Sequence, residues 1–238
     1  MSYVLHNRLG SGGFIIEATL ALAGVEMTYN PIESIPNTPV QEHIADINPW
    51  GQVPVLETPQ GDVITEVAAI ICYLAQHEDA CRNGPHLWNI DTASYLRWSV
   101  FMSVNIYEGI LRQSYPHRYF DVSSGLDAKN PASDTVVEAA VQAEMSMCIK
   151  TSAKKRVHEA FLLLEDVIDE GDFLLGPKMS SCDIFLALLY AWHNKQPDLP
   201  KCCEITRRVA SHRLINPIWE RNFHDRLDEK WHEIRPLW

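Results

Sequence analysis

The sequence predicts an α/β domain in residues 1–78, a linker in residues 79–87 and an all-α domain in residues 88–238. Short β-type runs alternate with helical runs only before the linker, and every apolar run after it has helical spacing. Charge divides the chain at the same place. Residues 1–80 contain one basic residue, Arg8, and ten acidic ones, whereas the rest of the chain contains 19 basic and 21 acidic residues. The linker combines charge, Gly and Pro, as connecting segments do.

The first half of the α/β domain has the pattern strand, helix, strand, helix. Residues 3–6 are expected to form the first strand. A turn-rich loop follows, and the apolar run 14–24 then predicts a helix with Gly24 as its C-cap. Residues 25–29 are expected to form a second strand, and residues 40–47, preceded by two prolines, a short helix.

Two short β-type runs and a helix complete the domain. QVPVLET (52–58) and DVITE (62–66) are separated by a turn or hairpin signal, Pro-Gln-Gly-Asp. A helix is expected from Thr65 through EVAAIICYLAQH. The resulting order, βαβαββα, is that of a thioredoxin-like domain, a small mixed sheet with helices on both faces.

After the linker the pattern predicts an all-α bundle. A polar insert, residues 120–133, interrupts it and fits either a surface loop or a lid, of which we favour the loop. The helices are expected at 88–113, at 132–169 as one or two helices, and at 179–194, 201–212 and 217–227.

The sharpest helix start in the chain is MSSCDIFLALLYAW. Ser180 as N-cap and Asp183 three residues later predict a capping box, in which each side chain accepts a main-chain amide. Met179 and Ile184 stand where a hydrophobic staple would lie. The helix that follows is apolar all round, so we expect it at the buried centre of the bundle.

Composition and charge exclude several classes of protein. Hydrophobic residues make up 46% and charged residues 21% of the chain, which is ordinary globular usage. A net charge of −11 argues against nucleic-acid binding. The richest apolar run has nine residues, too few to span a membrane, and the first residues lack the features of a signal peptide. We therefore expect a cytoplasmic protein.

Cysteines and histidines give no sign of a metal site. The six cysteines form no CxxC pair, which predicts free thiols in a cytoplasmic chain. The ten histidines show no HxH or HExxH spacing.

Three segments resemble one family. NPWGQVPVLET (48–58) followed by ITEVAAIICYLA (64–75) is similar to the glutathione-binding half of soluble glutathione transferases, and SSCDIFLA (180–187) is similar to the capping box of that family's second domain. The resemblance covers nearly the whole chain in the same order. It implies the glutathione transferase fold, glutathione as co-substrate and a homodimer. Ser11 and a YPxR segment point to a Ser-type bacterial or fungal member.

The resemblance also assigns a glutathione site. The Val53–Pro54 bond is implied to be cis, which turns the N–H and C=O of Val53 outward to pair with the cysteinyl backbone of glutathione. Gln52 could donate to the glycine end of the tripeptide, or be a solvated loop amide. Glu66 is implied to face the γ-glutamyl amino group. Val67 stands where the family usually has Ser, so binding of the γ-glutamyl carboxylate would rely on the main-chain N–H of Val67.

Ser11 is the candidate catalytic residue. The family places a Tyr, Ser or Cys near the start of its first helix to address the sulfur, and Ser11 is the only hydroxyl or thiol in LGSGGF. Its hydroxyl, the neighbouring amides and the helix dipole would favour thiolate over thiol. The alternative is that Ser11 is only an N-cap. The absence of Cys or Tyr here argues against the disulfide-exchange and Tyr-type branches.

A pocket for an electrophile is expected between Ser11 and the first long helices of the second domain. Its candidate lining residues are aromatic, although aromatic residues taken singly are more often core than pocket: Phe14, Phe101, Tyr107 and Tyr115. Tyr115 opens the segment YPHR, which could bring a hydroxyl and a cation to the site. For the carboxylates of glutathione the candidate cations are Arg8, Arg97 and Arg112, or a residue of a partner subunit.

Together these features predict a cytosolic glutathione transferase of detoxification or secondary metabolism that delivers the thiolate of glutathione to a hydrophobic electrophile. Two alternatives stay open. One is glutathione-dependent isomerisation or ether cleavage, and the other is a binding or regulatory protein that kept the fold and lost turnover.

Overall fold

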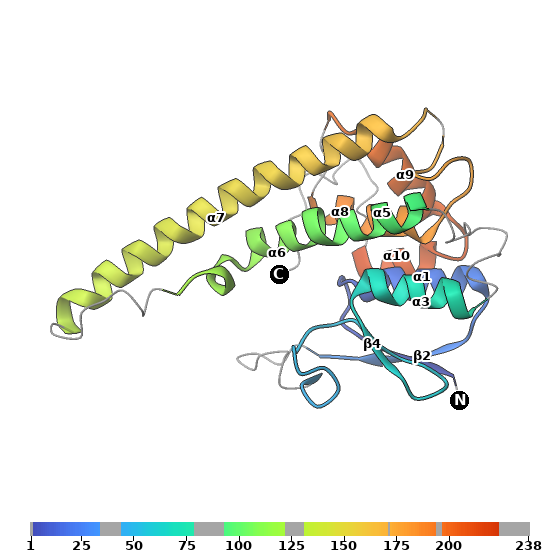
Figure 1. Ribbon diagram of the computed structural model, residues 1–238, viewed down its shortest axis with the longest axis horizontal. Helices are drawn as coiled ribbons and strands as arrows, with labels where there is room; N and C mark the ends of the chain where they lie inside the picture. Colours follow the sequence, from blue (N-terminus) through green and yellow to red (C-terminus); the bar gives the residue numbers. More distant parts are fainter. Residues whose placement is uncertain are drawn as a thin grey trace.

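The computed structural model describes residues 2–33, 44–78, 93–121, 131–170, 172–193 and 197–223, with the main chain alone for residues 131–138. A small sheet and two helices form one part of the molecule, and a group of helices forms the other (Figure 1). The buried core is continuous between the two parts. The predicted linker, the first half (40–43) of the predicted helix 40–47 and most of the insert 120–133 lie outside the described residues.

The sheet has four strands in the order β2-β1-β3-β4. Strand β1 (Tyr3–Asn7) pairs in parallel with β2 (Met27–Pro31) and antiparallel with β3 (Val55–Glu57), which pairs antiparallel with β4 (Val63–Thr65). The predicted mixed sheet is confirmed. Strand β2 starts two residues later than expected, because Met27 is the first residue in register with Tyr3.

Helices α1 (Gly13–Ala23) and α3 (Val67–His77) lie on the same face of the sheet, between the sheet and the second domain (Figure 1). Gly24 caps α1 with a φ of 68°, as predicted. Ile32, Ile44 and Val55 form a separate buried cluster. A thioredoxin-like domain followed by an all-helical domain is therefore the observed architecture.

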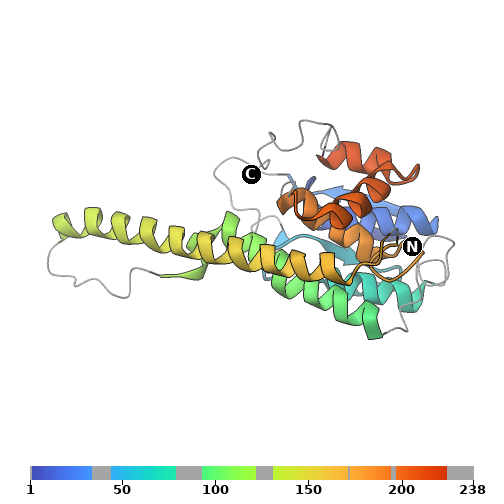
Figure 2. The same cartoon turned by 90° about the horizontal axis from the view of Figure 1, so that it is seen from above.

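The regular elements in the described residues of the second domain are all helices. The predicted helix 88–113 is seen from residue 93 as a run interrupted by a π-helical segment. Of the one or two helices predicted at 132–169, one is present, with 37 residues, and its N-terminal part projects as an arm (Figures 1 and 2). The elements are α5 (Ala93–Phe101), the π-helical η1 (Met102–Tyr107), α6 (Glu108–Ser114), the 3₁₀ turn η2 (Pro116–Tyr119), α7 (Pro131–Val167), α8 (Ser181–His193), α9 (Pro200–Ser211) and α10 (Asn216–Phe223).

Helix α8 is the buried centre of this domain, as predicted, since all 13 of its residues are buried. The carboxylate of Asp183 accepts hydrogen bonds from the Ser180 N–H (2.7 Å) and the Leu174 N–H (2.8 Å). The Ser180 hydroxyl donates to the same carboxylate (2.7 Å) instead of accepting the Asp183 amide. Only the Asp183 half of the expected capping box is thus formed, and it also ties α8 to the preceding loop.

Membrane spans, cysteines and metal-binding clusters can be assessed for the described residues. No helix there is long and apolar enough to cross a membrane. The five cysteines in this part of the chain are free thiols. No group of three or more His, Cys, Asp or Glu side chains in the same residues could hold a metal ion.

Candidate functional site

Two adjoining cavities lie where the sheet domain meets η1 and α6. They share four residues: Gln52, Val53, Tyr107 and Leu111. The large cavity, of about 520 Å³, is also lined by Arg8, Gly10, Ser11, Gly51, Ile110, Ser114, Tyr115, His117, Arg118 and Trp192. The small cavity, of about 90 Å³, is also lined by Asn48, Pro54, Thr65, Glu66, Val67, Ser103 and Glu108. The large volume is in the range of small-molecule sites.

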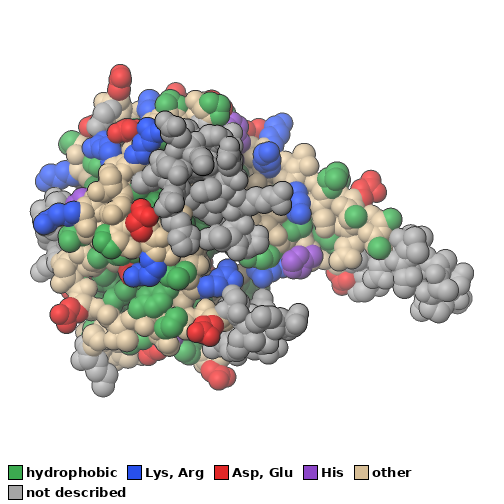
Figure 3. Space-filling view, turned by 180° about the vertical axis from the view of Figure 1, so that it is seen from behind, with side chains coloured by type: hydrophobic (Ala, Val, Ile, Leu, Met, Phe, Trp, Pro, Cys, Tyr) green, Lys and Arg blue, Asp and Glu red, His purple; other side chains and the backbone are tan. Residues whose placement is uncertain are grey.

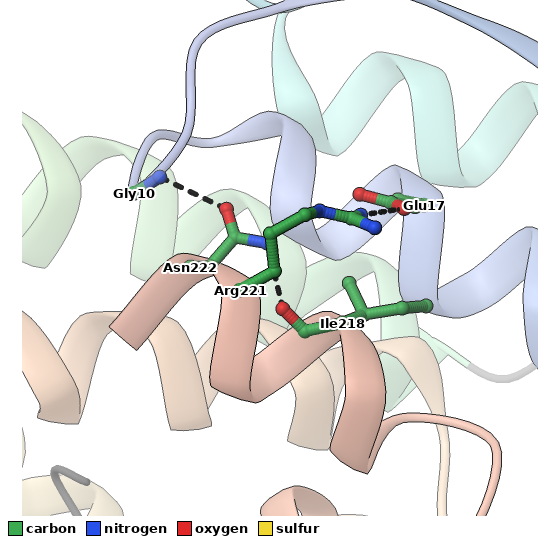
Figure 4. A network of polar contacts seen from close by, with 5 residues as sticks. All are labelled: Gly10, Glu17, Ile218, Arg221 and Asn222. Carbon is green, nitrogen blue, oxygen red and sulfur yellow. Dashed lines mark hydrogen bonds and ion pairs between the residues drawn. The ribbon is translucent and has the colours of Figure 1, made fainter. Parts of the chain in front are cut away.

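The loop that precedes α1 is held from two sides by the second domain. The Gly10 N–H donates to Asn222 Oδ1 at 2.9 Å, and the Trp192 indole N–H donates to the Gly10 carbonyl oxygen at 3.0 Å. Gly10 has a φ of 73°, which favours glycine. Figure 4 shows Asn222 and Arg221 side by side on α10, with Arg221 ion-paired to Glu17 of α1. The loop and α1 are therefore anchored to α10 together.

Ser11 lines the large cavity, but its hydroxyl is engaged by the protein. The Oγ atom lies 2.6 Å from Asn7 Oδ1 and 2.7 Å from the carbonyl oxygen of Arg8, and its single proton can serve one of them at a time. Asn7 Oδ1 also accepts the Gly13 N–H at 3.2 Å. Ser11 is not the N-cap of α1, because Gly12 holds that position and has no side-chain cap. The N-cap alternative for Ser11 is therefore wrong.

A second hydroxyl, that of Tyr107, lies beside the start of α1. A Cβ atom added to Gly12 would stand 2.7 Å from the Tyr107 oxygen, so only glycine leaves room for this approach. The Tyr107 ring packs edge-on against Trp192 and Phe185, with centroid distances of 5.1 and 6.2 Å. Burial, followed by the charge of Glu66, raises the pKa of Tyr107. The phenol therefore stays protonated at neutral pH and can donate a hydrogen bond.

The π-helical segment explains how Tyr107 reaches this position. It runs from Met102 to Tyr107, so Tyr107 is its last residue. Inserted π turns reorient the residues that follow, and they are frequent at functional sites. Such a turn leaves no mark in apolar periodicity, and the predicted helix was accordingly uninterrupted.

The main chain around Pro54 has the geometry expected from the resemblance. The Val53–Pro54 bond is cis. Among the described residues no hydrogen bond uses the N–H or C=O of Val53, which lines both cavities. The Asn48 side chain holds the preceding loop by donating to the Gln52 carbonyl oxygen at 2.8 Å. Val53 can thus offer one donor and one acceptor to an extended peptide.

Glu66 occupies an unusual backbone conformation at the start of α3. Its φ is 65° and its ψ 117°, and among the described residues other than glycine it alone has a positive φ. Such conformations concentrate at functional sites. Glu66 and Glu108 both line the small cavity, and the Glu108 carboxylate also pairs with Arg112. The Val67 side chain is buried.

The four aromatic residues expected in the pocket separate into two pairs. Tyr107 and Tyr115 line the large cavity. Phe14 does not, because it is fully buried against Trp219 and Phe223. Phe101 does not line either cavity and packs edge-on against Trp98.

Of the candidate cations, some line the large cavity and others do not. Arg8 lines the large cavity, and so does Arg118 of the YPHR segment. Arg97 instead stacks on Trp98, and Arg112 pairs with Glu108 at 3.4 Å.

Other lining residues, among them Ile110, Leu111 and Ser114, were not foreseen from the sequence. They follow the predicted residue Tyr107 at the spacings i+3, i+4 and i+7, which puts all four on one face of a helix and could have revealed this wall of the cavity. Trp192 carried no such signal, because its contact with Gly10 joins positions 182 residues apart.

Comparison with known proteins agrees with this architecture. Residues 15–77 match the family described as Glutathione S-transferase, N-terminal domain. The chain is 28% identical to elongation factor 1-gamma of Trypanosoma cruzi over 177 residues, which are 74% of this chain and 36% of that protein. It is 43% identical to probable elongation factor 1-gamma 1 of Arabidopsis thaliana over 75 residues, 31% of this chain and 17% of that protein. The matches thus span a minor part of these relatives.

A solved structure with a similar fold is that of a glutathione transferase homolog from Sulfitobacter with bound glutathione. It superimposes with a TM-score of 0.73 at 13% sequence identity, over 93% of this chain and 99% of that chain. The chain therefore has the glutathione transferase fold. The predicted fold is confirmed, whereas the curated relatives, which are elongation factor 1-gamma proteins, were not expected from the sequence.

Proposed function

We propose that this chain binds reduced glutathione across the two adjoining cavities and activates its thiol for attack on an electrophile in the large cavity. The observation that carries this proposal is the position of Val53. Its main chain, which has no hydrogen-bond partner among the described residues, lies at the boundary of the cavities. Glu66 lines the cavity on one side, and the loop before α1 lines the cavity on the other. A short peptide with an ammonium end and a thiol in its middle fits this arrangement.

In this proposal the γ-glutamyl end occupies the small cavity. The carboxylate of Glu66 would bind its ammonium group. The main-chain N–H of Val67, at the first turn of α3, would receive its carboxylate. Val53 would pair with the cysteinyl backbone, and Gln52, which lines both cavities, would reach the glycine end.

The sulfur would then lie in the large cavity near the start of α1. Ser11 is the proposed catalytic residue, and its hydroxyl proton would turn from Asn7 or Arg8 to the thiolate. The neutral Tyr107 phenol supplies a second donor beside the Gly12 amide. Lowering a thiol pKa from about 8.5 to about 6.5 requires roughly 2.7 kcal/mol, which two charge-assisted hydrogen bonds and a helix terminus can provide.

Conjugation is the reaction class we propose first, because an activated thiolate beside an apolar cavity needs no further group to attack an electrophile. In isomerisation or ether cleavage the same thiolate would add and later leave. Those reactions would be recognised by recovery of glutathione unchanged, or by its consumption only as disulfide. We also propose that the chain acts as a homodimer.

The experiment has two measurements. Calorimetry with reduced glutathione tests binding, and ultraviolet absorbance of the complex as a function of pH tests thiolate formation. We expect binding and a thiol pKa below 8, followed by turnover of at least one member of a panel of electrophiles. Absence of glutathione binding by the folded protein would overturn the proposal.

A second candidate is a glutathione-binding or regulatory protein without turnover. It is favoured by the likeness to proteins named elongation factor 1-gamma and by the engagement of the Ser11 hydroxyl with Asn7 and Arg8. Tight glutathione binding without thiolate absorbance would select this candidate over the first.

A further inference from the structure

The two cavities differ in the charge of the side chains that line them. Among the described residues, Arg8, His117 and Arg118 line the large cavity, and no Asp or Glu does. In the small cavity the reverse holds, with Glu66 and Glu108 among its described lining residues and no Lys, Arg or His. Basic side chains thus line one cavity and acidic side chains line the other, although the two cavities share part of their lining.

The basic lining of the large cavity is opposite in sign to the net charge of the protein. The chain has a net charge of −11, and Arg8 is the one basic residue among its first 80. That residue lies in the large cavity. A cleft lined by one sign of charge concentrates ligands of the opposite sign, and the low dielectric of its walls increases the effect. The large cavity therefore selects for anions within an acidic protein.

Arg118 is positioned for contact with a ligand. It stands in the short turn η2, and its guanidinium lies 4.1 Å from the centroid of the Tyr115 ring, which also lines the cavity. Stacking of this kind orients the guanidinium and leaves its N–H groups in plane for a carboxylate or sulfonate. Seen from behind, Lys and Arg side chains border a hollow close to where the arm of α7 leaves the body (Figure 3).

Part of the wall of the large cavity is apolar. Ile110 and Leu111 of α6 and Trp192 of α8 supply it. We infer that the second substrate of the proposed reaction is an apolar molecule that carries a negatively charged group, such as a carboxylate or a sulfonate, bound by Arg118. The role of this molecule as a substrate rests on the proposed function. The preference for an anion does not, because it comes from the side chains that line the cavity.

A carboxylate in the large cavity could also come from the glycine end of glutathione. In that case loss of Arg118 would weaken the binding of glutathione, and the affinity for other anions would stay the same. The experiment therefore measures both affinities separately.

A matched pair of fluorescent probes tests the inference without turnover. The anion is 8-anilinonaphthalene-1-sulfonate, and N-phenyl-1-naphthylamine is the same molecule without the sulfonate. The quantity measured is the ratio of the two dissociation constants in the folded full-length protein without glutathione. We expect Arg118→Gln to reduce the preference for the sulfonate about tenfold, as loss of a hydrogen bond to a charged group does. Arg118→Lys should restore part of it.

The matched control is Arg207→Gln, which removes the same charge from an exposed position on α9 that lines neither cavity. This variant should leave the ratio unchanged. In the wild-type protein, raising the salt concentration should weaken binding of the sulfonate and not of the neutral probe. The salt series gives an answer even if an Arg118 variant fails to fold.

Three results would overturn the inference. The first is that Arg118→Gln and Arg207→Gln change the ratio of the two dissociation constants equally. The second is that the affinity for the sulfonate probe does not depend on the salt concentration. The third is that Arg118→Gln changes only the binding of glutathione, as measured by calorimetry. Failure of the proposed function would look different. In that case the protein would not bind glutathione at all, while the preference for the anionic probe would still depend on Arg118.

Discussion

The main-chain N–H of Gly10 donates a hydrogen bond of 2.9 Å to the side chain of Asn222, 212 positions later in the chain. Asn222 in turn donates from Nδ2 to the Ile218 carbonyl oxygen at 2.8 Å, so its own orientation is fixed by α10. Gly10 directly precedes Ser11, and its carbonyl is held by Trp192. The second domain therefore sets the position of the loop that carries the proposed catalytic residue.

The substitution Asn222→Ala should destabilise the protein and disturb the loop. It leaves the buried Gly10 N–H without an acceptor, which costs about 1–3 kcal/mol. Urea unfolding should show this loss, and the affinity for glutathione should fall with it. The matched control is Asn216→Ala, because Asn216 bonds only within its own neighbourhood, to the Ala210 carbonyl oxygen at 3.2 Å. If both variants bound glutathione equally well, Asn222 would have no special role in the site.

Ser11→Ala and Tyr107→Phe should each raise the pKa of the bound glutathione thiol. Each removes one hydroxyl from the start of α1, and a lost hydrogen bond to a thiolate corresponds to a shift of about one unit. Ultraviolet titration of the complex measures the shift directly. Tyr115→Phe is the control, because that hydroxyl belongs to the same cavity but not to the group around Gly12. A thiol pKa that Ser11→Ala leaves unchanged would contradict the catalytic assignment of Ser11.

The sequence was sufficient for those features that depend on local pattern. The apolar run 184–192 predicted a buried central helix, and α8 is that helix. Gly24 as the C-cap of α1 was likewise expected and is present. For these two features neighbouring residues carry the signal, so tertiary contacts were not needed to predict them. The cis bond before Pro54 was implied by the family resemblance and is also present.

The composition of the large cavity depends on contacts that local pattern does not contain. Phe14 is close to Ser11 in sequence, yet α1 directs its ring to the core formed with Trp219 and Phe223. Tyr107 is 96 positions from Ser11 but lies at the same loop, because a π turn and the packing of Trp192 bring it there. Sequence proximity was therefore a poor guide to which aromatic residues line the cavity.

Glu66→Gln should weaken glutathione binding about tenfold. The change removes the negative charge that would pair with the γ-glutamyl ammonium but keeps the size of the side chain. Calorimetry measures the effect, and Glu26→Gln provides the control, since Glu26 is an exposed acid of the same domain outside both cavities. If the two variants lost affinity equally, net charge rather than a specific contact would govern binding.

Asp183 should make the stability of the protein depend on pH in a direction opposite to that of most carboxylates. Burial raises the pKa of Asp183 to about 6, against the lowering effect of the hydrogen bonds it accepts from Leu174 and Ser180. The unfolded chain has the ordinary value of about 3.9. Between these values the folded protein binds more protons than the unfolded chain, so this contribution to stability is full below pH 4 and is lost as the pH rises through 6.

The difference in unfolding free energy between the wild type and Asp183→Asn isolates this effect. Asn does not titrate, whereas His193, whose pKa burial lowers to about 4, titrates in both proteins and cancels in the difference. We expect the wild type to lose up to about 3 kcal/mol relative to the variant between pH 4 and pH 7, the equivalent of two pKa units. Urea unfolding at a series of pH values measures it. A difference that is constant over this range would mean that Asp183 stays ionised in the folded protein, with its hydrogen bonds outweighing burial.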